Sequence, residues 1–166
     1  GQVPGPPGAL PVVHGDETGL DIGARPRIRC TSHPAAHRAG AVLIVDSAHG
    51  AHFGFAPGQP ESPVRLGADL VVQSLHKTLP SLTQTALLHR NGNRVSAETV
   101  RRYERMYQTS SPSYLLMAGM DFCVRLLQEQ GRELFSDFEK RLDRLYNRLS
   151  GLRNLRILSA ELPKQG

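Results

Sequence analysis

Two polar residues, Lys77 and Asp46, follow apolar runs and could together bind an aldehyde cofactor. The run Ala68-Asp69-Leu70-Val71-Val72 leads to Lys77 through a polar turn, and Ala41-Val42-Leu43-Ile44-Val45 leads directly into Asp46. Open α/β sheets bind ligands beyond the C-terminal ends of their parallel strands. At such a place a lysine amine can form a Schiff base with pyridoxal phosphate (PLP), while a carboxylate keeps the pyridine nitrogen protonated. The pair therefore predicts a PLP site.

Short strands followed by helices would position this pair. We expect strands at 41–45, 69–73 and 84–89, a glycine-rich loop at 46–58, a short helix near 61–67 and a turn at 90–93. Before them, residues 33–40 resemble a helix end closed by Gly40, and Val12-Val13 could end a strand. Helices should follow at about 96–108, 114–129 and 132–149, with Gly131 and Gly151 as stops, and a last strand could lie at 154–158. The pattern predicts an α/β fold with a mainly parallel sheet and flanking helices.

Composition is that of an ordinary globular domain. The 166 residues are 39% hydrophobic and 21% charged, with a net charge of +5. The positive excess lies in residues 90–166, where arginines alternate with acids as on a solvated helix face. No nucleic-acid reader motif accompanies it, and no apolar run approaches the ~20 residues that a membrane span needs. Cys30 and Cys123 are far apart, and no secretory signal is visible. We expect a cytoplasmic protein that binds neither nucleic acid nor membrane.

The motifs around both residues resemble one family. Asp46-Ser47-Ala48-His49-Gly50-Ala51-His52-Phe53-Gly54-Phe55 is followed by Ser74-Leu75-His76-Lys77-Thr78-Leu79 and by Thr109-Ser110-Ser111-Pro112-Ser113-Tyr114. Together these motifs look like the major domain of the Orn/Lys/Arg decarboxylases, a fold type I PLP-dependent family. The resemblance is best over residues 40–130. It implies a partial PLP-dependent transferase (type I) major domain, a small basic amino-acid substrate (lysine, arginine or ornithine), an amine and carbon dioxide as products, a role in polyamine biosynthesis, and a homodimer or larger homo-oligomer in the full-length family.

The resemblance also implies roles for individual residues. Lys77 would hold the cofactor covalently, and Asp46 would pair with its ring nitrogen. Ala48 would pack under the ring, and Ser74 and His76 would contact the phosphate. His49 lies on the same loop, and Lys77 or His76 would return a proton to the substrate carbon. No metal is expected.

Simpler interpretations stay open for the same residues. Lys77 could be one solvated lysine, Asp46 a helix N-cap, and Ser74 and His76 turn residues. His49 and His52 with Asp46 could bind zinc, although the loop offers no further strong ligand nearby. The chain could also be another type I enzyme, such as an aminotransferase, or a non-catalytic truncated homologue.

The chain departs from the family at both ends. Residues 1–40 contain no small-residue loop to grip the phosphate and no ring to stack on the cofactor, and residues 14–40 carry Pro26 and Pro34 where a regular helix is expected. We interpret residues 1–13 as a disordered lead-in, 14–150 as a partial decarboxylase major domain, and 151–166 as the truncated start of the next region. The chain should therefore bind PLP weakly and have little activity by itself.

Overall fold

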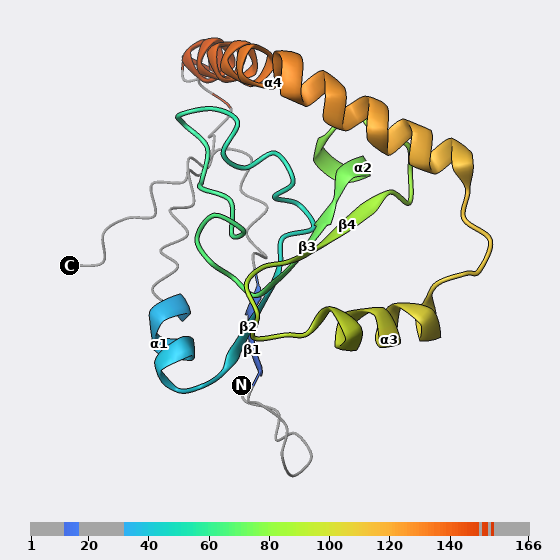
Figure 1. The fold of residues 1–166 in the computed structure, drawn as a ribbon. Coiled ribbons are helices and arrows are strands. Elements are labelled where there is room, and N and C mark those ends of the chain that lie inside the picture. Colours follow the sequence, from blue (N-terminus) through green and yellow to red (C-terminus); the bar gives the residue numbers. More distant parts are fainter. Residues whose placement is uncertain (1–11, 17–31, 150, 153, 155–166) are drawn as a thin grey trace.

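A four-stranded sheet organises the computed structural model, which describes residues 12–16, 32–149, 151–152 and 154 (Figure 1). Its strands are β1 (Val12–Asp16), β2 (Val42–Asp46), β3 (Leu70–Ser74) and β4 (Ala86–Arg90), in that order across the sheet. β1 pairs with β2 and β2 with β3 in parallel, whereas β4 is antiparallel to β3. The fold is thus α/β, and the described sheet is mixed.

The short connection from β3 to β4 explains the antiparallel pair. Only the one-turn helix α2 (Leu75–Thr78) and residues 79–85 join the two strands. A parallel crossover needs about a dozen residues or more, usually including a full helix that packs on the sheet. The chain instead reverses, helped by Gln84, whose φ of 70° lies in the left-handed region.

Two other expectations differ from the structure around the strands. Val12 and Val13, assigned above to the lead-in and to the possible end of a strand, instead begin strand β1. The helix expected near 61–67 is not formed, and residues 63–67 make consecutive turns in which the Leu66 amide donates to the Ser62 carbonyl over 3.0 Å. The expected strand at 154–158 falls almost entirely outside the described residues.

Two helix ends lie where the sequence predicts them, the C-terminal end of α1 and the N-terminal end of α3. α1 (Ser32–Arg38) is followed by Gly40, whose φ of 71° is the left-handed conformation of a helix-ending glycine. α3 (Ala97–Tyr107) begins after Ser96, whose hydroxyl accepts a hydrogen bond from the Thr99 amide over 3.0 Å. None of the residues of α3 is buried.

The predicted helix stop at Gly131 is wrong. α4 (Tyr114–Leu149) is one continuous helix of 36 residues in which Gly131 is buried. A Cβ atom built on Gly131 would lie 2.9 Å from Cδ1 of Phe55. The glycine is there because an aromatic ring packs against the helix backbone, not because the helix ends.

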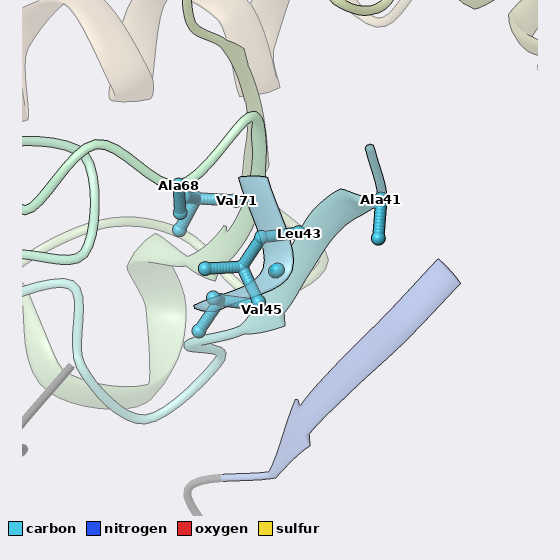
Figure 2. Packing of buried hydrophobic residues seen from close by; sticks show 6 residues of the cluster. Ala41, Leu43, Val45, Ala68 and Val71 are labelled. Atoms are coloured by element: carbon cyan, nitrogen blue, oxygen red, sulfur yellow. The ribbon is translucent and has the colours of Figure 1, made fainter. Parts of the chain in front are cut away.

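Two hydrophobic clusters hold these elements together. The first joins α1, β2 and β3 through Ala36, Ala41, Leu43, Val45, Ala68 and Val71 (Figure 2). The second joins the loop after β2, α2 and α4 through Ala51, Leu75, Leu79, Cys123 and Leu127. This second cluster places α4 over α2 and the C-terminal ends of β2 and β3 (Figure 1).

Among the helices of the described residues, none combines the length and the apolar composition that crossing a bilayer would require.

Candidate functional site

Asp46 and Lys77 lie at the C-terminal ends of two neighbouring strands. Asp46 is the last residue of β2 and lies opposite Val72 in the parallel register. β3 ends two residues after Val72, at Ser74, and Lys77 lies in α2 directly beyond it. The structure therefore brings the carboxylate and the amine to the same edge of the sheet, and both residues are exposed.

The register also puts the Asp46 and Ser74 side chains on one face of the sheet. Successive side chains of a strand alternate between faces, so Asp46, its partner Val72, and Ser74 share a face, together with Leu88, the partner of Val72 on β4. Val72 and Leu88 are 37% and 43% exposed. An apolar, solvent-exposed surface thus lies beside the carboxylate, as a planar aromatic ligand would require.

Hydrogen bonds fix the start of the loop after β2. Oδ1 of Asp46 accepts a bond from the Ala48 amide over 3.0 Å, and this bond does not involve Oδ2. The Ser47 amide donates to the Val72 carbonyl over 2.9 Å, and the Ser74 amide donates to the Ala48 carbonyl over 3.3 Å. Ala48 is half-buried and His49 exposed. The Asp46 loop is therefore attached along the end of β3.

A second set of bonds orients His76. Its Nδ1 lies 2.9 Å from the Thr85 carbonyl oxygen, which also accepts the Leu75 amide over 3.0 Å. A carbonyl only accepts, so Nδ1 carries the proton and the neutral ring keeps its lone pair on Nε2. His76 can therefore donate from Nε2, to a phosphate or to a carbon, only as the doubly protonated imidazolium.

The two hydroxyl residues near His76, Ser74 and Thr78, have buried or half-buried side chains. Ser74, the N-cap of α2, is buried but makes no side-chain capping bond. Oγ1 of Thr78 is buried without a hydrogen-bond partner. Unsatisfied buried hydroxyls are uncommon in folded proteins and call for a partner such as a ligand or water. A hydroxyl-rich turn next to an exposed amine suits a phosphorylated aldehyde.

His52 has a different environment from the other predicted residues. Its ring stacks on Phe135 at a centroid separation of 6.0 Å and meets Phe53 edge-on at 4.9 Å, and its buried Nδ1 has no hydrogen-bond partner. Within the described residues, no group of three or more His, Cys, Asp or Glu side chains could hold a metal ion. His52 thus packs between the Asp46 loop and α4.

This environment predicts that acid destabilises the chain. Burial lowers the pKa of His52 below its usual 6.5, and also lowers the pKa of His89. As the pH falls through about 6.5, the unfolded chain takes up protons that the folded chain refuses, so the free energy of unfolding falls. Denaturant unfolding at pH 7.5 and 5.5 should show a smaller loss in His52→Phe than in the unsubstituted chain. Equal losses in both proteins would contradict this prediction.

Two buried residues next to the candidate site, Gln73 and Thr85, were not predicted from the sequence. Both are buried, at 7% and 2% exposure. Gln73 contacts the Asp46 loop, and Thr85 contacts α2. The available signal was a glutamine at the end of the apolar run Val71-Val72, because a polar side chain buried in a strand must find partners.

Comparison with known proteins supports a decarboxylase relationship. Residues 31–164 match the family model described as the Orn/Lys/Arg decarboxylase major domain. The chain is 38% identical over 133 residues to an uncharacterised protein, YaaO, of Bacillus subtilis. This match covers 77% of this chain and 27% of YaaO. The chain is also 33% identical to arginine decarboxylases of Bacillus subtilis (127 residues; 76% and 26%) and of Halalkalibacterium halodurans (120 residues; 72% and 24%). The chain thus spans about a quarter of the length of these curated relatives.

Proposed function

Because the chain belongs to the Orn/Lys/Arg decarboxylase family through its major domain, we propose that it carries the PLP-binding core for decarboxylation of a basic amino acid. The observation that supports this most is the placement of Asp46 and Lys77 at the ends of adjacent parallel strands. Arginine is the first substrate to test, since four curated relatives are named arginine decarboxylases. Lysine and ornithine are the alternatives within the family description.

The residues of this edge suit PLP. Oδ2 of Asp46 is the oxygen that we assign to the protonated ring nitrogen, because Oδ1 is bound by the Ala48 amide. Ala48, small and half-buried, would lie against the ring, and His49 would line the same loop. Lys77, exposed one residue after His76, would supply the amine that attaches the aldehyde.

Bound PLP would withdraw the electrons of the bond between the substrate carbon and its departing carboxylate. The residues of the chain would hold the reacting groups and move protons. Lys77 would exchange with the substrate amine, and the Lys77 ammonium or the imidazolium of His76 would return a proton to the substrate carbon. The Thr85 carbonyl fixes the His76 ring, so Nε2 is the atom that would carry this proton or contact the phosphate together with Ser74.

The open site suggests weak catalysis by the chain alone. Asp46 and Lys77 are exposed, and the sheet face that carries Asp46 also carries the exposed side chains of Val72 and Leu88. Charge interactions weaken by an order of magnitude in water relative to a closed site, so both cofactor binding and charge stabilisation should suffer. The second candidate is a non-catalytic homologue that keeps the fold.

Borohydride reduction followed by peptide mass mapping tests the proposal. After incubation with PLP, the adduct should appear on the peptide containing Lys77, and Lys77→Ala should lose it entirely. Lys140→Ala, which removes an exposed lysine of α4, is the matched control and should keep the adduct. Adducts spread equally over the surface lysines would refute the assignment. Amine release is then measured with arginine, lysine and ornithine. Release from one of them identifies the substrate, and no release from any of them supports the non-catalytic alternative.

A further inference from the structure

We propose that Gln73 is a positioning residue that clamps the loop carrying Asp46 against the strand leading to Lys77. The inference rests on the proposed function, because its consequence is a fixed separation between the two groups that would hold PLP. The side-chain hydrogen bonds of Gln73 go to Gly50 and His89, not to Asp46 or Lys77. It is 7% exposed and lies in β3, one residue before Ser74.

Both ends of the Gln73 amide are engaged. Its Nε2 donates to the Gly50 carbonyl over 3.2 Å, and its Oε1 lies 2.9 Å from Nε2 of His89. An amide oxygen only accepts, so His89 donates from Nε2 and thereby fixes which way the Gln73 amide points. Burial lowers the pKa of His89, which favours the neutral ring in this place. Gln73 thus joins β4, β3 and the Asp46 loop.

The clamp lies where the strand ladder stops. The parallel register of β2 and β3 ends at the pair Asp46 and Val72. Beyond it, two backbone bonds continue the attachment, from the Ser47 amide to the Val72 carbonyl and from the Ser74 amide to the Ala48 carbonyl. The side chain of Gln73 adds a third bond, to the carbonyl of Gly50. Gly50 lies four residues after Asp46, beyond the last pair of the ladder.

Gly50 is shaped to receive this bond. A Cβ atom there would collide with Oγ of Ser47 and lie 2.7 Å from the Phe53 ring, so only glycine fits the turn without a shift of its neighbours. Its carbonyl accepts the Phe53 amide over 3.1 Å as well as the Gln73 side chain. The Gly50 carbonyl oxygen therefore accepts two hydrogen bonds, one from the Phe53 amide within the turn and one from the Gln73 side chain.

Three variants separate a positioning role from general stability. Gln73→Met keeps the length of the side chain and removes both bonds. Gln73→Glu keeps an acceptor for His89 but has no donor for the Gly50 carbonyl. Asn91→Leu is the matched control, because the Asn91 side-chain amide also donates to a backbone carbonyl, that of Val64 over 2.9 Å, at the other end of β3.

Two measurements on the full chain decide the outcome. The first is the Kd for PLP from absorbance titration. Loss of one well-placed hydrogen bond should raise it about tenfold in Gln73→Met and Gln73→Glu, and leave it unchanged in Asn91→Leu. The second is amide hydrogen exchange without cofactor, which should accelerate at residues 47–50 in both Gln73 variants only.

Each result bears on one proposal. Unchanged exchange at 47–50 in the Gln73 variants overturns the clamp, and so does an unchanged Kd, or an equal rise in Asn91→Leu. If the unsubstituted chain binds no PLP, the proposed function fails for this chain. The exchange data then still decide whether Gln73 holds the loop.

Discussion

Replacing Asp69 by alanine should lower the free energy of unfolding by about 3 kcal/mol. Asp69 precedes β3 and is 3% exposed. Its Oδ2 accepts bonds from the Leu43 amide and from Nε2 of His37, each at 2.8 Å, and its Oδ1 lies 3.9 Å from Nε of Arg94. Alanine would leave a buried amide and an imidazole without this acceptor, between β2, α1 and the turn after β4.

Two further variants define the cause of that loss. Asp69→Asn keeps an oxygen for the Leu43 amide, so it should lose less stability than Asp69→Ala. Asp121→Ala removes an exposed carboxylate that pairs with Arg125 on α4 over 2.8 Å, and should leave the urea midpoint almost unchanged. Equal midpoints for Asp69→Ala and Asp121→Ala would show that the buried carboxylate does not hold these elements together.

The same substitution at two glycines of α4 should have opposite effects. Gly119→Ala should raise the free energy of unfolding by up to about 1 kcal/mol, because alanine is the better helix former. Its Cβ would lie 3.1 Å from Cδ1 of Leu82, an exposed side chain that can move. Gly131→Ala should lower the free energy by about 1–3 kcal/mol, since its Cβ would lie 2.9 Å from the Phe55 ring.

The ring behind Gly131 allows a direct check of the cause. Phe55 stacks on Phe135 at a centroid separation of 5.4 Å, so it has little room to retreat. If the clash is responsible, Phe55→Leu should cost less in the Gly131→Ala background than in the unsubstituted chain. Additive losses in a double-mutant cycle, or a stabilising Gly131→Ala, would argue against close packing as the reason for this glycine.

The sequence predicted the elements that carry the candidate site because their signals are local. Apolar runs of strand length identified β2 and β3, and polar residues at their ends pointed to Asp46 and Lys77. Gly40 and Ser96 marked helix boundaries through conformations and bonds that span only a few residues. A cofactor at this edge remains a prediction.

Features that depend on distant partners were missed. Gly131 has the local signature of a helix stop, and only the Phe55 ring, far away in sequence, explains its place inside α4. The direction of β4 follows from the length of the connection through α2, and the apolar pattern of the strand is the same in either direction. Asp69 lies within an apolar run and Gln73 at the end of one, and their partners His37 and His89 come from other elements.

The exposure of α3 has a consequence for how the chain holds together. With eleven residues and none buried, this helix is near the length at which isolated helices are only marginal in water. It lies between the sheet and α4 in sequence, yet α4 is fastened to α2 through Leu75, Cys123 and Leu127. After a peptide-bond break within α3, this cluster between α4, α2 and the loop after β2 would be what joins the two pieces.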